Sequence, residues 1–181
     1  MVKISGVDLV KYLLSKYGPL PQKKLQKLAY FAEYGYIKKY GERLSDLSFK
    51  RYYYGPYSEG IEENVIIKEQ DNGYPTKLSE LVNEKVDIDN KLAAEIDSLL
   101  LPYINRNGSE LEKLADETQP YIDAEEFNNP IKMDDFAWYY RLINSREFWE
   151  EAEKIHNENI KKGAYHKHII KSDAELDELF S

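Results

Sequence analysis

Apolar residues recur every three or four positions along most of the chain, and this spacing places them on one face of a helix. The first such segment follows Ser5, which with Asp8 matches a capping box, where paired side chains satisfy free backbone donors. Gly18 is expected to end this helix. Its apolar stripe consists of Val7, Val10, Leu14 and Tyr17.

A second helix is predicted from Pro21 to about Tyr40. Proline suits the first helical position because its missing N–H would lack a partner there in any case. Apolar side chains occupy a wide arc of this helix, so we expect it to lie at the centre of the fold. Its lysines are then expected to point outward past that arc, namely Lys23, Lys24, Lys27, Lys38 and Lys39.

Strand-like alternation of apolar and polar residues replaces the helical period over residues 47–53. The pair Gly55-Pro56 ends this segment, because proline removes a donor from a strand ladder. A third helix is expected over residues 57–70. The short stretch 82–88 fits either a second strand or a loop.

Four more helices are predicted after that stretch. One begins near Asp89, and a short one opens with a capping-box pair, Ser109 and Glu112. The aromatic-rich segment 133–143 forms the next, and Ser145 caps the last and longer one. Together these elements predict a single-domain fold that is mainly α with a small β element (α+β) and contains about seven helices.

The composition excludes several classes of protein. The chain has 181 residues, of which 42% are apolar and 32% charged, a balance typical of a globular domain. Without cysteine it has neither disulfides nor a thiolate metal site, which suits a reducing compartment. No run approaches the roughly 20 apolar residues that a membrane span needs. We therefore expect a cytoplasmic protein with no membrane partner.

Charge is unevenly distributed along the sequence. Residues 1–60 contain 11 Lys and Arg against 5 Asp and Glu, whereas residues 61–181 contain 14 against 28, which gives the net charge of −8. A basic face built from the first segment would attract an acidic partner or RNA. Folding can equally intermix the two sets of charges, and the sequence leaves both possibilities open.

Motifs for catalysis and for cofactor binding are lacking in the sequence. It contains neither a P-loop nor a dinucleotide fingerprint. His166 and His168 have a spacing that metal sites use, but no clear third ligand accompanies them. No serine or carboxylate pattern defines a nucleophile. We therefore predict no enzymatic activity, no cofactor and no metal.

An aromatic and basic run stands out at Lys50-Arg51-Tyr52-Tyr53-Tyr54. Rings interleaved with cations anchor protein partners or stack on nucleic-acid bases. A half-buried strand explains the same five residues equally well. The following Gly55-Pro56-Tyr57 reads as a turn into the next helix.

Two segments together resemble a known family. Residues 24–32 read K-L-Q-K-L-A-Y-F-A, and after Tyr40-Gly41 and Phe49 a Y-G-P-Y turn follows at 54–57. This pattern resembles the SocA-like, or Panacea, antitoxin domain. Downstream, the segment 109–121 departs from the family pattern, because it has no histidine and carries Pro120-Tyr121 in place of Pro-Trp.

The resemblance implies a mainly helical domain that neutralises a cognate toxin by direct contact, in some cases as an adaptor to an AAA+ protease. It assigns residues 1–163 to the domain and 164–181 to a polar tail or short helix of the same domain. The alternative hypothesis is a nucleic-acid-binding regulator that uses the basic first third. The candidate partner-binding residues are Lys24, Lys27, Lys50, Arg51, Tyr52, Tyr54, Gly55, Pro56 and Tyr57.

Overall fold

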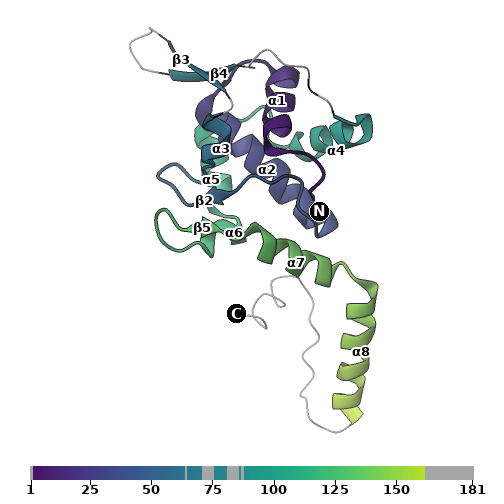
Figure 1. Cartoon of the computed structure of the whole chain (residues 1–181). Coiled ribbons are helices and arrows are strands. Elements are labelled where there is room, and N and C mark those ends of the chain that lie inside the picture. The colour runs from purple at the N-terminus through teal and green to yellow at the C-terminus, as the bar shows by residue number, and fades with distance from the viewer. Residues whose placement is uncertain (1, 64, 71–75, 81–85, 87, 162–181) are drawn as a thin grey trace. The chain divides into compact units, whose positions relative to one another are not determined.

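The structure, a computed structural model, describes residues 2–63, 65–70, 76–80, 86 and 88–161 (Figure 1). These residues form eight helices and five short strands, which confirms a mainly helical fold with a small β component. The chain divides into two compact units, residues 1–144 and residues 145–181. The assignment of residues 1–163 to one domain stays a prediction.

Helix α1 (Gly6–Tyr17) begins and ends where the sequence predicts. The Ser5 hydroxyl oxygen accepts from the backbone N–H of Asp8 at 3.1 Å, and the same hydroxyl donates to the Asp8 carboxylate at 2.6 Å. At the other end Gly18 has a φ of 77° and donates its N–H to the Leu14 carbonyl at 2.9 Å. Local capping chemistry therefore defines both ends of this helix.

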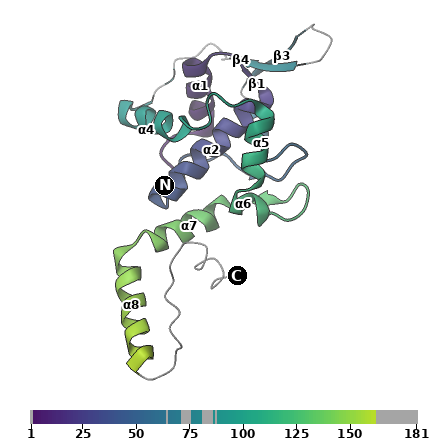
Figure 2. The same ribbon diagram turned by 180° about the vertical axis from the view of Figure 1, so that it is seen from behind.

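Helix α2 (Gln22–Tyr40) is the centre of the first unit, as its apolar arc predicts. Its middle is buried on all sides, and the flat stacking of Phe31 on Tyr103 at 4.0 Å is one of its contacts. The two opposite views in Figures 1 and 2 show helices of the first unit on different sides of it. Those that contact it are α1, α4 (Asn90–Leu100), α5 (Gly108–Asp116) and α7 (Met133–Ile143).

Two small antiparallel sheets complete this unit. Strand β2 (Phe49–Lys50) pairs with β5 (Pro130–Ile131), with Phe49 opposite Ile131. The second sheet has the order β1-β4-β3, in which β4 pairs with both of its neighbours. Its strands are β1 (Leu20–Pro21), β3 (Ile66–Gln70) and β4 (Thr76–Glu80).

The helix predicted over residues 57–70 is wrong. Only Glu59–Glu62 forms a helix, α3, and the chain then enters strand β3. Consecutive isoleucines at 66 and 67 favour a strand, and pairing with β4 supplies hydrogen bonds that a sequence pattern does not reveal. The strand predicted over residues 47–53 is likewise only Phe49–Lys50.

The later helices lie close to the positions predicted from the sequence, with small differences at their ends. Helix α7 matches the predicted segment 133–143, but the capping box before α5 involves Asn107 and Glu110 rather than Ser109 and Glu112. A one-turn helix, α6 (Gln119–Ile122), follows α5. In the second unit α8 spans Arg146–Lys161.

Several sequence predictions fall outside the described residues. They include most of the stretch 82–88 and everything after residue 161, with His166 and His168 among them. Within the described residues no helix is long and apolar enough to cross a membrane.

Candidate functional site

The Tyr-Gly-Pro turn lies in a hairpin-like loop, residues 51–57, which we call the tyrosine loop. Lys50 and Tyr57 bracket it through two backbone hydrogen bonds, of 2.9 and 3.0 Å. Gly55 has a φ of 83°, and a Cβ added there would lie 2.9 Å from Cε of Lys27. The glycine is therefore required both by the backbone conformation and by the close approach of α2.

Helix α2 holds the inner side of this loop. The Lys27 ammonium donates to the Pro56 carbonyl at 2.7 Å, while the Gln26 side chain donates to the Ser58 carbonyl at 2.9 Å and accepts from its N–H at 2.8 Å. The K-L-Q-K segment and the Y-G-P turn, which carry the resemblance, are thus in direct contact.

The expectation that Lys27 points outward is wrong, and Gly55 and Pro56, two further partner-binding candidates, are not exposed. Lys27 is only 2% exposed, and both turn residues are buried. Burial lowers the pKa of Lys27 to about 7, although the carboxylates of Glu112 and Asp116 act in the opposite direction. Lys27 therefore positions the loop and is not available to a partner.

The outer side of the loop carries exposed rings. Tyr53 is 72% and Tyr54 64% exposed, and Phe127, which lies more than 70 residues further along the sequence, is 50% exposed. The rings of Tyr53 and Phe127 are 4.3 Å apart, and Tyr52 stacks on both Phe127 and Tyr57, at 5.2 and 4.8 Å. We call Tyr52, Tyr53, Tyr57 and Phe127 the aromatic platform.

Backbone pairing brings Phe127 to the tyrosine loop. The Asn128 N–H donates to the Arg51 carbonyl at 2.8 Å, and the Arg51 N–H donates to the Asn129 carbonyl at 2.9 Å. Asn128 adopts a left-handed φ of 69°, a conformation that asparagine tolerates better than most residues. The contribution of Phe127 was missed, because only the β2–β5 pairing joins the two segments. An isolated phenylalanine between acidic residues and an Asn-Asn-Pro turn is the one local signal.

The cations of the predicted site already have partners within the protein. Lys24 donates to the Ile104 carbonyl at 2.6 Å, and Lys50 forms an ion pair with Glu59 at 2.6 Å. The Arg51 guanidinium donates to the Tyr121 carbonyl at 2.9 Å and lies 4.3 Å from the centre of its ring. The side chains of Lys50 and Arg51 therefore stabilise the shape of the loop rather than extend from it.

Folding also mixes the two charge sets of the sequence. Several basic residues of the first 60 pair with acids from beyond residue 61. They are Lys16 with Asp97, Lys23 with Glu112, Lys39 with Glu95 and Arg43 with Asp134. A separate basic face, which the nucleic-acid alternative would use, is therefore weakened by these pairs.

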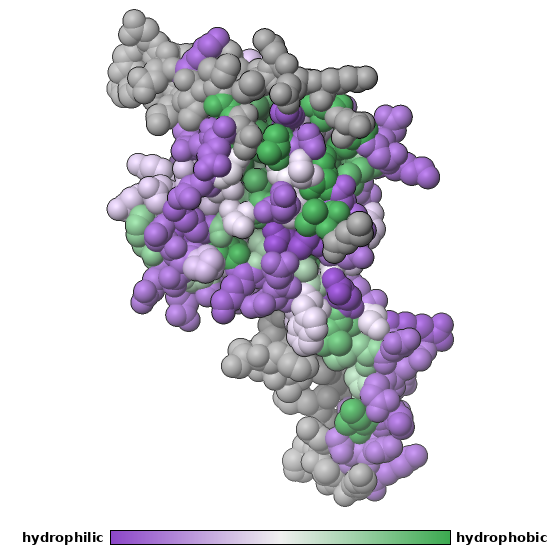
Figure 3. Space-filling model, viewed as in Figure 1, coloured by the Kyte–Doolittle hydropathy of each residue, from purple (hydrophilic) through white to green (hydrophobic). Residues whose placement is uncertain are grey.

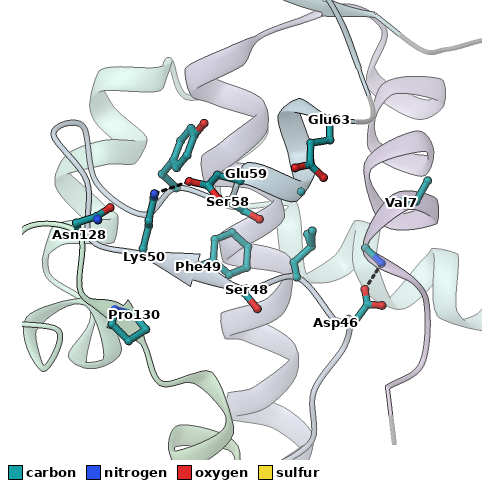
Figure 4. A pocket seen from close by; sticks show the side chains of 14 residues that line it. Val7, Asp46, Ser48, Phe49, Lys50, Ser58, Glu59, Glu63, Asn128 and Pro130 are labelled. Atoms are coloured by element: carbon teal, nitrogen blue, oxygen red, sulfur yellow. Dashed lines mark hydrogen bonds and ion pairs between the residues drawn. The ribbon is translucent and has the colours of Figure 1, made fainter.

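A pocket of about 560 Å³ lies beside the platform (Figure 4). Its walls come from the start of α1, strand β2, the start of α3 and the loop before β5. It shares Lys50 and Tyr57 with the tyrosine loop, and it also contains Asn128, next to Phe127. Three carboxylates face it, those of Asp46, Glu59 and Glu63.

The pocket does not assemble a catalytic group of a familiar kind. Ser48 and Ser58 line it, but no histidine does. The Asp46 carboxylate accepts from the Gly6 N–H at 2.6 Å and so caps the entry to α1. Across the described residues, no three acidic or histidine side chains are close enough together to hold a metal ion.

These features define a mainly helical domain with a rigid, ring-rich surface loop. The family model described as "Antitoxin SocA-like, Panacea domain" matches residues 25–176, and the chain belongs to this family. Searches of curated proteins and of solved structures returned no match.

Proposed function

We propose that this protein is a non-enzymatic binding module that neutralises a cognate toxin by direct contact through the aromatic platform and Tyr54. The observation that carries the proposal is the exposure of Tyr53 and Tyr54 on the tyrosine loop and of Phe127 beside it. Helix α2 holds the inner side of this loop through the hydrogen bond from Lys27 to the Pro56 carbonyl. Exposed tyrosines with few rotatable bonds are efficient anchors for a protein partner. Membership of an antitoxin family makes a toxin the expected partner.

The candidate residues then divide into two roles. Tyr52, Tyr54 and Tyr57 offer ring surface to the partner. Lys27, Lys50, Arg51, Gly55 and Pro56 hold the loop in the shape that presents those rings. Lys24 bonds to the Ile104 carbonyl instead, and it has neither role.

Co-expression tests the proposal. The protein of the neighbouring gene, the expected toxin, should arrest growth alone and should be neutralised and co-purified when the full chain is present. The double variant Tyr53→Ala/Tyr54→Ala should lose at least about tenfold in affinity, because it removes two exposed anchors. Leu101→Ala, which truncates a 73% exposed side chain elsewhere, is the matched control.

Two outcomes would contradict the proposal. One is the absence of both a complex and growth rescue. The other is rescue that the tyrosine variant retains in full. Repeating the rescue in cells that lack the AAA+ protease separates neutralisation by contact from delivery to proteolysis, since only delivery requires the protease.

A further inference from the structure

We infer that the toxin segment bound here is basic, with an arginine or lysine that lies over the aromatic platform and reaches the carboxylates of the neighbouring pocket. This inference rests on the proposed function and adds the chemistry of the partner. It reverses the expectation from the sequence, in which a basic loop would attract an acidic partner or RNA.

The first support is the charge that is left around the platform. Glu125 and Glu126 directly precede Phe127 and are exposed, and among the described residues neither carboxylate has a cationic partner. Of the two cations at the tyrosine loop, Lys50 is paired with Glu59, and Arg51 is half-buried against the ring and carbonyl of Tyr121. Glu125 and Glu126 therefore outnumber Arg51, the one cation at the loop that no carboxylate pairs with among the described residues.

The second support is the pocket that continues the platform. Its three carboxylates, of Asp46, Glu59 and Glu63, face a single cation, Lys50. Glu63 is exposed and has no cationic partner among the residues that the structure describes. In Figure 4 Glu59 lies at the start of α3, where it pairs with Lys50, and Glu63 lies directly after the end of α3. Its volume of about 560 Å³ falls in the range of sites that bind ligands.

The third support is the chemistry of the rings. Tyrosine and phenylalanine faces attract cations, and inside this loop Lys50 already lies 5.5 Å from Tyr52 and 5.6 Å from Tyr57. The outer rings of Tyr53 and Phe127 offer the same attraction to a partner. An arginine side chain satisfies both features, because it stacks on rings and forms paired bonds with carboxylates. A nucleic-acid backbone would meet the same carboxylates with repulsion.

The face of the first unit that Figure 3 shows is mainly hydrophilic. Hydrophilic residues cover much of the visible face of the first unit, and apolar residues show between them in patches (Figure 3). Binding here is thus expected to depend on ionic strength, as exposed charges are screened over roughly 8 Å at physiological salt.

The test uses two fluorescein-labelled peptides and the full chain. One carries alternating arginine and leucine, and its counterpart carries glutamate in place of arginine. Only the arginine peptide should bind, and the variant Glu125→Lys/Glu126→Lys should weaken binding by about tenfold through charge repulsion. Glu125→Gln/Glu126→Gln, which keeps the side-chain shape, should weaken it less. The matched control is Glu147→Lys/Glu153→Lys on α8, which makes the same change of charge elsewhere.

The same variants in the toxin rescue assay separate the two proposals. If the tyrosine variant loses rescue while the Glu125 and Glu126 reversal keeps it, toxin binding stands and the basic-partner inference is overturned. If neither variant affects rescue, both fail. Preferred binding of the glutamate peptide, or equal weakening by the α8 control, would also overturn the inference.

Discussion

At the scale of single residues, Lys27 shows how a charge can be held inside a core. Its aliphatic stem packs within the helical unit while its amine bonds to the Pro56 carbonyl. Burial lowers the pKa of Lys27 from its ordinary 10.5 to about 7, so between these values the unfolded chain binds more protons than the native one. The contribution of Lys27 to stability therefore rises with pH across that window.

Replacing Lys27 should remove this pH dependence. The difference in unfolding free energy between the wild type and Lys27→Met is expected to grow from pH 7 to pH 10, by up to about 1.4 kcal/mol per pH unit. Urea titrations at several pH values measure it. Lys27→Arg, which keeps a donor but stays charged throughout the range, should flatten the curve in the same way. Parallel curves for the wild type and both variants would contradict the buried position.

Glu33 is a second buried charge, and its carboxylate binds the segment that follows α2, residues 43–45. Its carboxylate is fully buried and accepts from the Arg43 guanidinium at 2.5 Å, from the N–H groups of Leu44 and Ser45 at 3.1 and 2.8 Å, and from the Ser45 hydroxyl. Burial raises the pKa of Glu33, while Arg43 and Ser45 oppose the rise.

Removing this charge should be costly. Glu33→Gln is expected to lower the unfolding free energy by about 3 kcal/mol, because it leaves part of Arg43 and the loop donors without their charged acceptor. Glu95→Gln, which breaks the surface pair with Lys39, should cost less than about 1 kcal/mol. Urea unfolding at neutral pH compares the two, and equal losses would refute the structural role of Glu33.

At the scale of elements, the sequence was most informative where local chemistry decides the structure. The ends of α1 follow from its caps, whereas α7 follows from its apolar period and from the two acids in its first turn, Asp134 and Asp135. The segment 57–70 was misread because its period fits a helix, whereas the strand of residues 66–70 forms by pairing with residues 76–80. Lys27 was misplaced for a related reason: only the tertiary contact with the Tyr-Gly-Pro turn explains its burial.

The junction of α2 and α7 gives an element-scale prediction. Gly41 ends α2 with a φ of 63°, and a Cβ added there would overlap the backbone of Arg141 in α7. Gly41→Ala carries the left-handed penalty of about 1 kcal/mol. The overlap with Arg141 should add about 1–3 kcal/mol, because α7 must shift.

Thermal unfolding of the wild type and of Gly41→Ala measures the loss of stability. A loss of only about 1 kcal/mol, the backbone penalty alone, would mean that α7 does not pack as closely on Gly41 as the structure shows.

At the scale of the whole molecule, the sequence predicted which segment contributes to the candidate site but not which side chains form its surface. The aromatic run at residues 50–54 was visible in the sequence, yet its cations turn inward and Phe127 joins it from a distant loop. A linear charge count suggested a basic face because it cannot show which charges pair. At the rings Lys50 is paired with Glu59, so Glu125 and Glu126 are exposed carboxylates without a cationic partner among the described residues.

The division into two units yields the last prediction. Among the described residues, the buried residues of the hydrophobic core lie between Ile4 and Ala137, whereas the family match extends to residue 176. A chain truncated after Asn144 should therefore still unfold in one cooperative transition, with a Tm within about 4 °C of the full chain, since that shift corresponds to roughly 1 kcal/mol. Calorimetry measures the Tm, and toxin rescue by the same fragment shows whether residues 145–181 serve binding. A fragment that is unfolded at 25 °C would show instead that the second unit is part of the fold, and the core would then have to extend beyond Ala137.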